Sequence, residues 1–277
     1  MVGGDSVERE NVKFQANINY YVLTLIFILI MAFEVANFVD PVVEPQLDGF
    51  ELLRLLGFPA ASIFSFWVAK KYWGSTVFGK AYLALGIGYA FYTAGDSMWY
   101  FYEVILQQAP YPSFADIGYF GFYPFAIYHM RTNIKYFKRH LEKRQKMILL
   151  SIPIGSCLIY VFFTIFIVDA SAGIFHTVVS QDTKINPIEF SVGLAYIAAT
   201  TVTFSFAIIG TQVFRSGVLG SAWGLLLIGI ALNTMADYYY YFSENFGEYL
   251  RSNPVHGVWL ASTMIICYAL YKHVKSV

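Results

Sequence analysis

The chain has 277 residues, of which 57% are hydrophobic, 19% aromatic and 13% charged, and its formal net charge at pH 7 is zero. A soluble domain carries roughly a quarter charged residues, so this composition excludes an ordinary soluble protein and indicates an integral membrane protein. The apolar segments are also far longer than the roughly ten-residue strands of a membrane barrel, which excludes that class.

Eight apolar stretches are long enough to cross a bilayer, since a transmembrane helix needs about 20 residues. In chain order we expect them at 19–39, 50–69, 79–105, 112–130, 147–168, 188–213, 218–242 and 255–272. The predicted fold is an all-α integral membrane protein with eight transmembrane helices, forming a single membrane domain without a soluble domain.

Lysine and arginine gather in the segments that follow the even-numbered helices. These basic residues are Lys70, Lys71, Lys80, Arg131, Lys135, Lys138, Arg139, Lys143, Arg144, Lys146, Arg215, Lys272 and Lys275. The alternate loops are mostly acidic. Because cytoplasmic loops of membrane proteins carry the excess of basic residues, we expect a multi-pass protein of the cell membrane with both termini in the cytoplasm.

The basic linker 131–146 has two interpretations. It is either an orientation signal alone or, in addition, a docking site for a cytoplasmic protein partner. Orientation accounts for its charge, so we predict no nucleic-acid partner.

A passage of the third predicted helix recurs in the seventh. Residues 81–103 and 222–244 align without a gap, and ten of the 23 positions are identical. The repeat divides the chain into two units of four helices, 1–140 and 141–277. Because each unit has an even number of helices, both insert in the same direction, which predicts two parallel pseudo-repeats.

Both copies carry carboxylates inside an apolar helix. Asp96 is equivalent to Asp237, and Glu103 is equivalent to Glu244. At 1.5 Å per residue, Asp96 lies about 24 Å from the cytoplasmic end of its helix, in the outer third of the bilayer. Carboxylates are costly there, so two at equivalent positions predict a paired site.

Other groups are expected at the same depth. Asp116 falls in the first turn of the fourth helix, where it either caps the helix or adds a third acid to the site. Arg54 is nearly the only cation available as a counter-ion. The predicted ligand-binding residues are Arg54, Asp96, Trp99, Tyr100, Glu103, Asp116, Asp237, Tyr241 and Glu244.

Three interpretations of the Asp96–Asp237 pair are open. The two aspartates bond other side chains across helices as structural groups, they line a ligand pocket, or they bind or move a cation or proton. The sequence has no phosphate-binding loop, GxSxG, HExxH or CxxC motif. We therefore predict no cofactor and no metal site.

The segment 95–124, which reads GDSMWYFYE and then YPSFADIGYFGFYP, resembles a motif of eight-helix membrane domains fused to bacterial diguanylate cyclases. Those domains are tandem four-helix repeats regarded as sensory inputs. The resemblance implies a sensory role. No cyclase follows the last predicted helix, so we expect the chain to act alone or through a partner.

A more distant similarity is to lysoplasmalogenase-like membrane hydrolases, which also have eight helices. Gly95-Asp96 and Asp237 occupy the places of their paired acids, and Gly121, Phe125 and His129 match a pattern in their fourth helix. The tyrosine that follows this histidine in the family is absent. The similarity implies that Asp96 and Asp237 are catalytic, one protonating a vinyl ether and the other activating water.

We therefore expect a polytopic protein that binds a membrane lipid or other small amphiphile in an outward-facing acidic and aromatic pocket, for sensing. The alternatives are the intramembrane hydrolase and a structural or assembly subunit of a membrane complex.

Overall fold

The computed structural model describes residues 20–36, 49–75, 77–108, 111–171, 186–215, 219–244 and 254–275. These residues form eight α-helices and no strand, which confirms the all-α prediction. In chain order the helices are Tyr20–Ala36, α2 (Gly49–Lys71), α3 (Phe78–Tyr100), α4 (Ala115–Phe137), α5 (Lys143–Ser171), α6 (Pro187–Phe214), α7 (Gly220–Glu244) and α8 (Val255–Lys275). A π-helix, η1 (Phe101–Ile105), extends α3.

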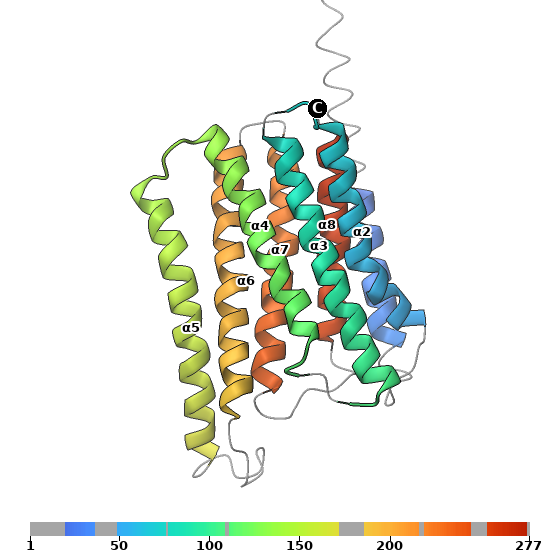
Figure 1. Ribbon diagram of the computed structural model, residues 1–277, viewed down its shortest axis with the longest axis vertical. Coiled ribbons are helices and arrows are strands. Elements are labelled where there is room, and N and C mark those ends of the chain that lie inside the picture. The colour runs from blue at the N-terminus through green and yellow to red at the C-terminus, as the bar shows by residue number, and fades with distance from the viewer. Residues whose placement is uncertain are drawn as a thin grey trace, which may run out of the picture.

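Six of these helices close a ring (Figure 1). Going round it, α2 contacts α3, α3 contacts α4, α4 contacts α6, α6 contacts α7, α7 contacts α8, and α8 contacts α2. Helix α5 lies outside the ring, against α6. The two helices that carry the repeated passage, α3 and α7, are therefore on opposite sides of the ring and face a shared interior.

Glycines allow the close approach of neighbouring helices in the ring. A Cβ atom on Gly118 of α4 would lie 2.5 Å from the backbone nitrogen of Gly95 on α3. A Cβ atom on Gly229 of α7 would lie 2.5 Å from Cγ1 of Ile266 on α8. Small residues at helix crossings let backbones pack closely, and this brings the aspartate on each central helix within reach of the next helix.

Two of the described helical segments, Lys143–Ile165 and Pro187–Phe214, are long and apolar enough to cross a membrane. Along the first of them, Leu150, Ile154, Leu158 and Phe162 are all exposed. Their four-residue spacing puts them on one face of α5. A continuous exposed apolar face of this kind indicates contact with lipid or with another protein.

The basic segment 131–146 is mostly helical, which differs from the predicted linker. Helix α4 continues to Phe137 and α5 begins at Lys143, so only residues 138–142 connect them. Helix α4 continues because Asn133 and Ile134 are buried in the bundle. The basic charge of this segment is therefore spread over two helix ends and a short turn.

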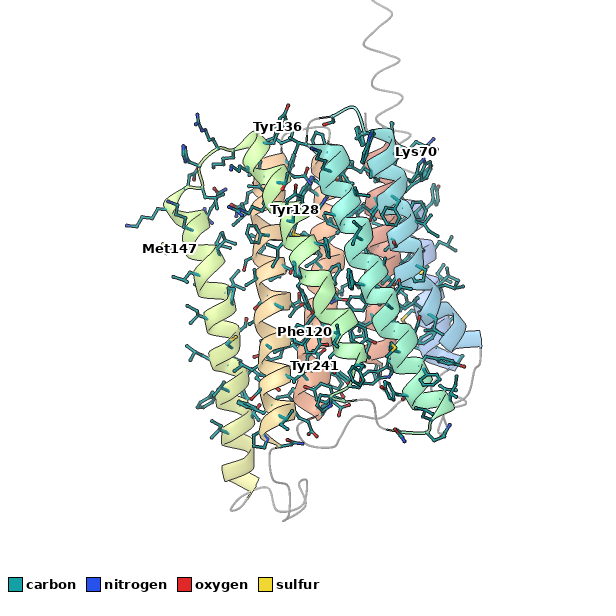
Figure 2. All side chains as sticks on the ribbon, viewed as in Figure 1. Lys70, Phe120, Tyr128, Tyr136, Met147 and Tyr241 are labelled. Carbon is teal, nitrogen blue, oxygen red and sulfur yellow. The ribbon has the colours of Figure 1, made fainter. Side chains whose placement is uncertain are left out.

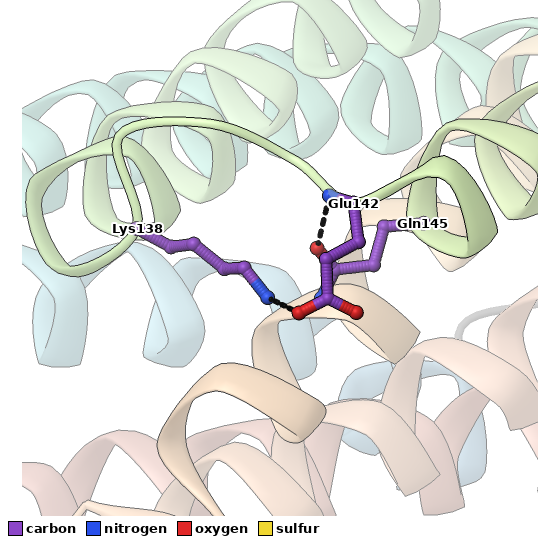
Figure 3. A network of polar contacts seen from close by, with 3 residues as sticks. All are labelled: Lys138, Glu142 and Gln145. Carbon is purple, nitrogen blue, oxygen red and sulfur yellow. Dashed lines mark hydrogen bonds and ion pairs between the residues drawn. The ribbon is translucent and has the colours of Figure 1, made fainter.

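The short turn is held by polar contacts of its own residues (Figure 3). The Lys138 ammonium lies 2.5 Å from a carboxylate oxygen of Glu142, and the Glu142 amide donates to Oε1 of Gln145 at 3.1 Å. The hydrogen bond from Lys138 lowers the pKa of the Glu142 carboxyl below its usual value. Glu142 is thus an ion-paired carboxylate far from the predicted site.

Candidate functional site

A cavity of about 50 Å³, called the acidic cavity below, lies inside the ring near the start of α4. Tyr241, one of its lining residues, lies toward the end of the bundle opposite Tyr136 (Figure 2). The lining residues are Phe58, Tyr92, Asp96, Trp99, Tyr111, Asp116, Tyr119, Asp237, Tyr240, Tyr241 and Trp259. Five predicted site residues therefore meet here: Asp96, Trp99, Asp116, Asp237 and Tyr241.

Asp237 accepts hydrogen bonds from four helices. Trp259 of α8 donates its indole N–H to Oδ1 at 2.9 Å. Thr200 of α6 and Asn233 of α7 donate to Oδ2 at 3.1 and 2.8 Å, and Tyr123 of α4 donates as well. Both carboxyl oxygens of Asp237 therefore accept hydrogen bonds. This aspartate thus ties the helices together as well as lining the cavity.

Asp96 is held from the neighbouring helix α4. The Tyr119 hydroxyl donates to Oδ1 of Asp96 at 2.9 Å, and Asp96 is buried. The contact depends on the Gly95–Gly118 crossing, because these glycines directly precede the two bonded residues in α3 and α4. Asp96 and Asp237 thus share one arrangement, in which an aromatic donor on the next helix of the ring holds the carboxylate.

Asp116 combines the two roles considered for it. Its Oδ2 accepts the Ser113 amide at 2.6 Å, and the Ser113 hydroxyl accepts the Ala115 amide at 3.1 Å, which together cap the start of α4. Its Oδ1 accepts the Tyr196 hydroxyl of α6 at 2.6 Å. Because Asp116 also lines the cavity, the capping role does not remove it from the site.

Glu103 and Glu244 are not among the described lining residues of the cavity, but each follows a lining residue, Trp99 or Tyr240, by one helical turn. Glu103 accepts the indole N–H of Trp99 at 3.0 Å, and Glu244 follows Tyr240 at the same four-residue spacing. Trp99 and Tyr240 are equivalent positions of the repeat, and their rings meet across the interior with centroids 5.8 Å apart. Equivalent residues of the two copies therefore contact each other in the interior of the ring.

Two predicted site residues, Tyr100 and Arg54, are not among the described lining residues of the cavity. Tyr100 is half-buried and is not among the lining residues of the cavity. The side chain of Arg54 lies outside the described residues, so its pairing with an aspartate stays a prediction.

Six lining residues are not among the predicted ligand-binding residues: Phe58, Tyr92, Tyr111, Tyr119, Tyr240 and Trp259. They come from α2, α3, the segment before α4, α4, α7 and α8. The repeat could have predicted Tyr119 and Trp259. Tyr119 lies near the start of α4, the helix after the first repeated passage, and Trp259 lies near the start of α8, the helix after the second.

The chemical character of the cavity follows from its residues. Among the described residues there is no group of three or more His, Cys, Asp or Glu side chains that could hold a metal ion. The lining instead presents carboxylates and aromatic rings. This arrangement can bind a compact polar or cationic group, or place two carboxylates beside one reacting group.

Comparisons with known proteins gave no match: no family model, no curated protein and no solved structure was found to be similar to this chain.

Proposed function

We propose that this chain is a multi-pass membrane protein and that the acidic cavity faces the outside of the cell. The support is the pair of long apolar helices, the exposed apolar face of α5, and the basic residues gathered at one end of the bundle. That end holds the α4–α5 turn and the C-terminal end of α8, where Lys71 of α2 bonds the backbone oxygen of Val274 (Figure 1). By the basic-residue rule it is the cytoplasmic end.

We further propose that the acidic cavity binds the polar head of a small amphiphile and that binding serves sensing. One observation carries this proposal: Asp96, Asp116 and Asp237, from three different helices, line a single cavity. A single water needs about 10–15 Å³, so a cavity of about 50 Å³ accommodates a head group of a few atoms rather than a whole lipid. The resemblance of 95–124 to sensory membrane domains supports the sensing role.

Native mass spectrometry of gently extracted protein tests this function. We expect the wild type to carry a defined small mass and Asp96→Asn to lose it, with occupancy falling about tenfold or more. A hydrogen bond to a charged group contributes about 1.5–3 kcal/mol, which corresponds to that change. Asp96 is the better site for this test because Asp237 also holds four helices.

Glu142→Gln is the matched control, since it removes a carboxylate from the opposite end of the bundle and should leave the bound mass unchanged. If no specific mass is found on the wild type, the aspartates are structural and the binding function is wrong.

The hydrolase is a second candidate, favoured by the fact that Asp96 and Asp237 line one cavity. Two carboxylates in different surroundings are suited to act as general acid and general base. In that case Asp96→Asn would stall turnover, so the bound mass would be kept or increased rather than lost. A structural or assembly subunit would tolerate Asp96→Asn and show no specific mass in either protein.

A cytoplasmic partner at 131–146 is a further proposal, supported by its exposed basic turn.

A further inference from the structure

The described wall of the acidic cavity is built from two kinds of side chain. Eight of the eleven described lining residues are aromatic, and the other three are Asp96, Asp116 and Asp237. None of these eleven described residues is lysine, arginine or histidine. The three aspartates are 4%, 8% and 3% exposed, so their carboxyl groups are almost completely withdrawn from solvent. Buried charge is costly unless an opposite charge compensates it.

The aromatic rings form a continuous wall. Tyr240 is the central ring, with centroid distances of 5.8 Å to Trp99, 5.6 Å to Trp259, 6.0 Å to Tyr111 and 5.0 Å to Tyr241. The interplanar angles of these pairs run from 59° to 77°, so neighbouring rings are steeply inclined to one another. A small group inside the cavity therefore meets several aromatic surfaces at once.

Four hydrogen-bond donors of this wall are already used within the protein. The indole N–H of Trp259 points to Asp237 and that of Trp99 to Glu103, while the Tyr119 hydroxyl donates to Asp96. The Tyr111 hydroxyl donates to the backbone oxygen of Glu189. These four donors are therefore not available to an anion, whereas the carboxyl groups and the aromatic faces of the wall can contact a cation.

We propose that the group bound in the acidic cavity is an organic ammonium, such as a trimethylammonium head. Aromatic faces attract cations through the negative face of the ring, and several faces around one site are suited to a methylated ammonium. The nearby carboxylates supply the opposite charge. The inference rests on the proposed function and adds the chemical class of its ligand. A free amine and a lipid head group share this chemistry.

The wild type alone tests the charge requirement. We would titrate purified protein, in nanodiscs of phosphatidylglycerol, with choline and with the uncharged analogue of choline in which carbon replaces the nitrogen. Binding is read from the fluorescence of Trp99 and Trp259 and by calorimetry. We expect choline to bind at least tenfold more tightly than its analogue. Equal binding of the two compounds would overturn the proposal, because the cavity would then recognise shape and not charge.

Variants of one ring test the aromatic requirement. Tyr240→Leu is expected to weaken choline binding about tenfold, Tyr240→Phe distinctly less because the ring is kept, and Glu142→Gln not at all. If Tyr240→Leu binds choline as well as the wild type, the aromatic wall is not the recognition element and the proposal is wrong.

Two further results distinguish a lipid head group from a free amine, and a wrong ammonium inference from a wrong binding function. A single-chain choline phospholipid that binds much more tightly than choline would identify a lipid head group, while equal affinities would identify a free amine; both support the ammonium. If choline fails to bind but native mass spectrometry finds another mass that Asp96→Asn loses, the ammonium inference is wrong and the binding function stands.

Discussion

Replacing Asp237 by alanine is expected to lower the free energy of unfolding by about 3 kcal/mol or more. The change leaves four donors without their acceptor: Thr200 and Tyr123, which are buried, and Trp259 and Asn233, which are partly buried. Each orphaned donor costs about 1–3 kcal/mol when it finds no substitute, and these four come from four different helices. The loss therefore affects the ring as a whole, which denaturant unfolding of the purified protein in mixed micelles measures.

Glu142→Ala is the control for Asp237→Ala. It also removes a carboxylate with a hydrogen-bonded partner, but in the exposed turn between α4 and α5, so we expect no measurable change in unfolding. An Asp237→Ala protein that unfolds at the wild-type denaturant concentration would show that the four hydrogen bonds do not stabilise the bundle.

Gly118→Ala is expected to destabilise the protein by roughly 1–3 kcal/mol through overpacking. The added methyl would lie 2.5 Å from the nitrogen and 2.7 Å from the Cα of Gly95, and backbone atoms cannot turn aside as a side chain can. Helices α3 and α4 must therefore separate, which also moves Tyr119 away from Asp96. Denaturant unfolding would measure the loss of stability, and choline or native-ligand binding would fall with it.

The chain offers two matched glycine controls. A Cβ atom on Gly155 of α5 or Gly224 of α7 would meet nothing within 4 Å. Alanine at these positions should be neutral or stabilise its helix by up to about 1 kcal/mol, because glycine is the poorer helix former. If Gly118→Ala behaves like Gly155→Ala, the close crossing of α3 and α4 is not required.

The sequence was a good guide to the helices and to the central acids. Long apolar runs predicted the positions of the helices. The repeat indicated Asp96 and Asp237 as a pair, and both line one cavity in the structure. Both features can be recognised within the sequence of one helix, without knowledge of its neighbours. The choice between a capping and a site role for Asp116 needed the fold, since only the fold shows that Tyr196 of α6 reaches it.

The features that were not predicted from the sequence depend on how neighbouring helices pack against one another. Phe58 and Tyr111 reach the cavity from segments that share no spacing pattern with Asp96. Tyr100 was included because it lies one turn after Asp96, but the cavity follows Tyr92, Asp96 and Trp99, at intervals of four and three residues. The basic segment was misjudged because burial of Asn133, which charge counting does not register, extends α4 beyond its apolar run.

The central claim is that the acidic cavity holds a ligand, and a cryo-electron microscopy map of the protein in native lipid nanodiscs tests it most directly. The account predicts compact non-protein density bounded by Asp96, Tyr240 and Trp259, absent from the map of Asp96→Asn prepared in the same way. A wild-type cavity that contains only ordered water, or that is filled by the protein's own side chains, would contradict the claim.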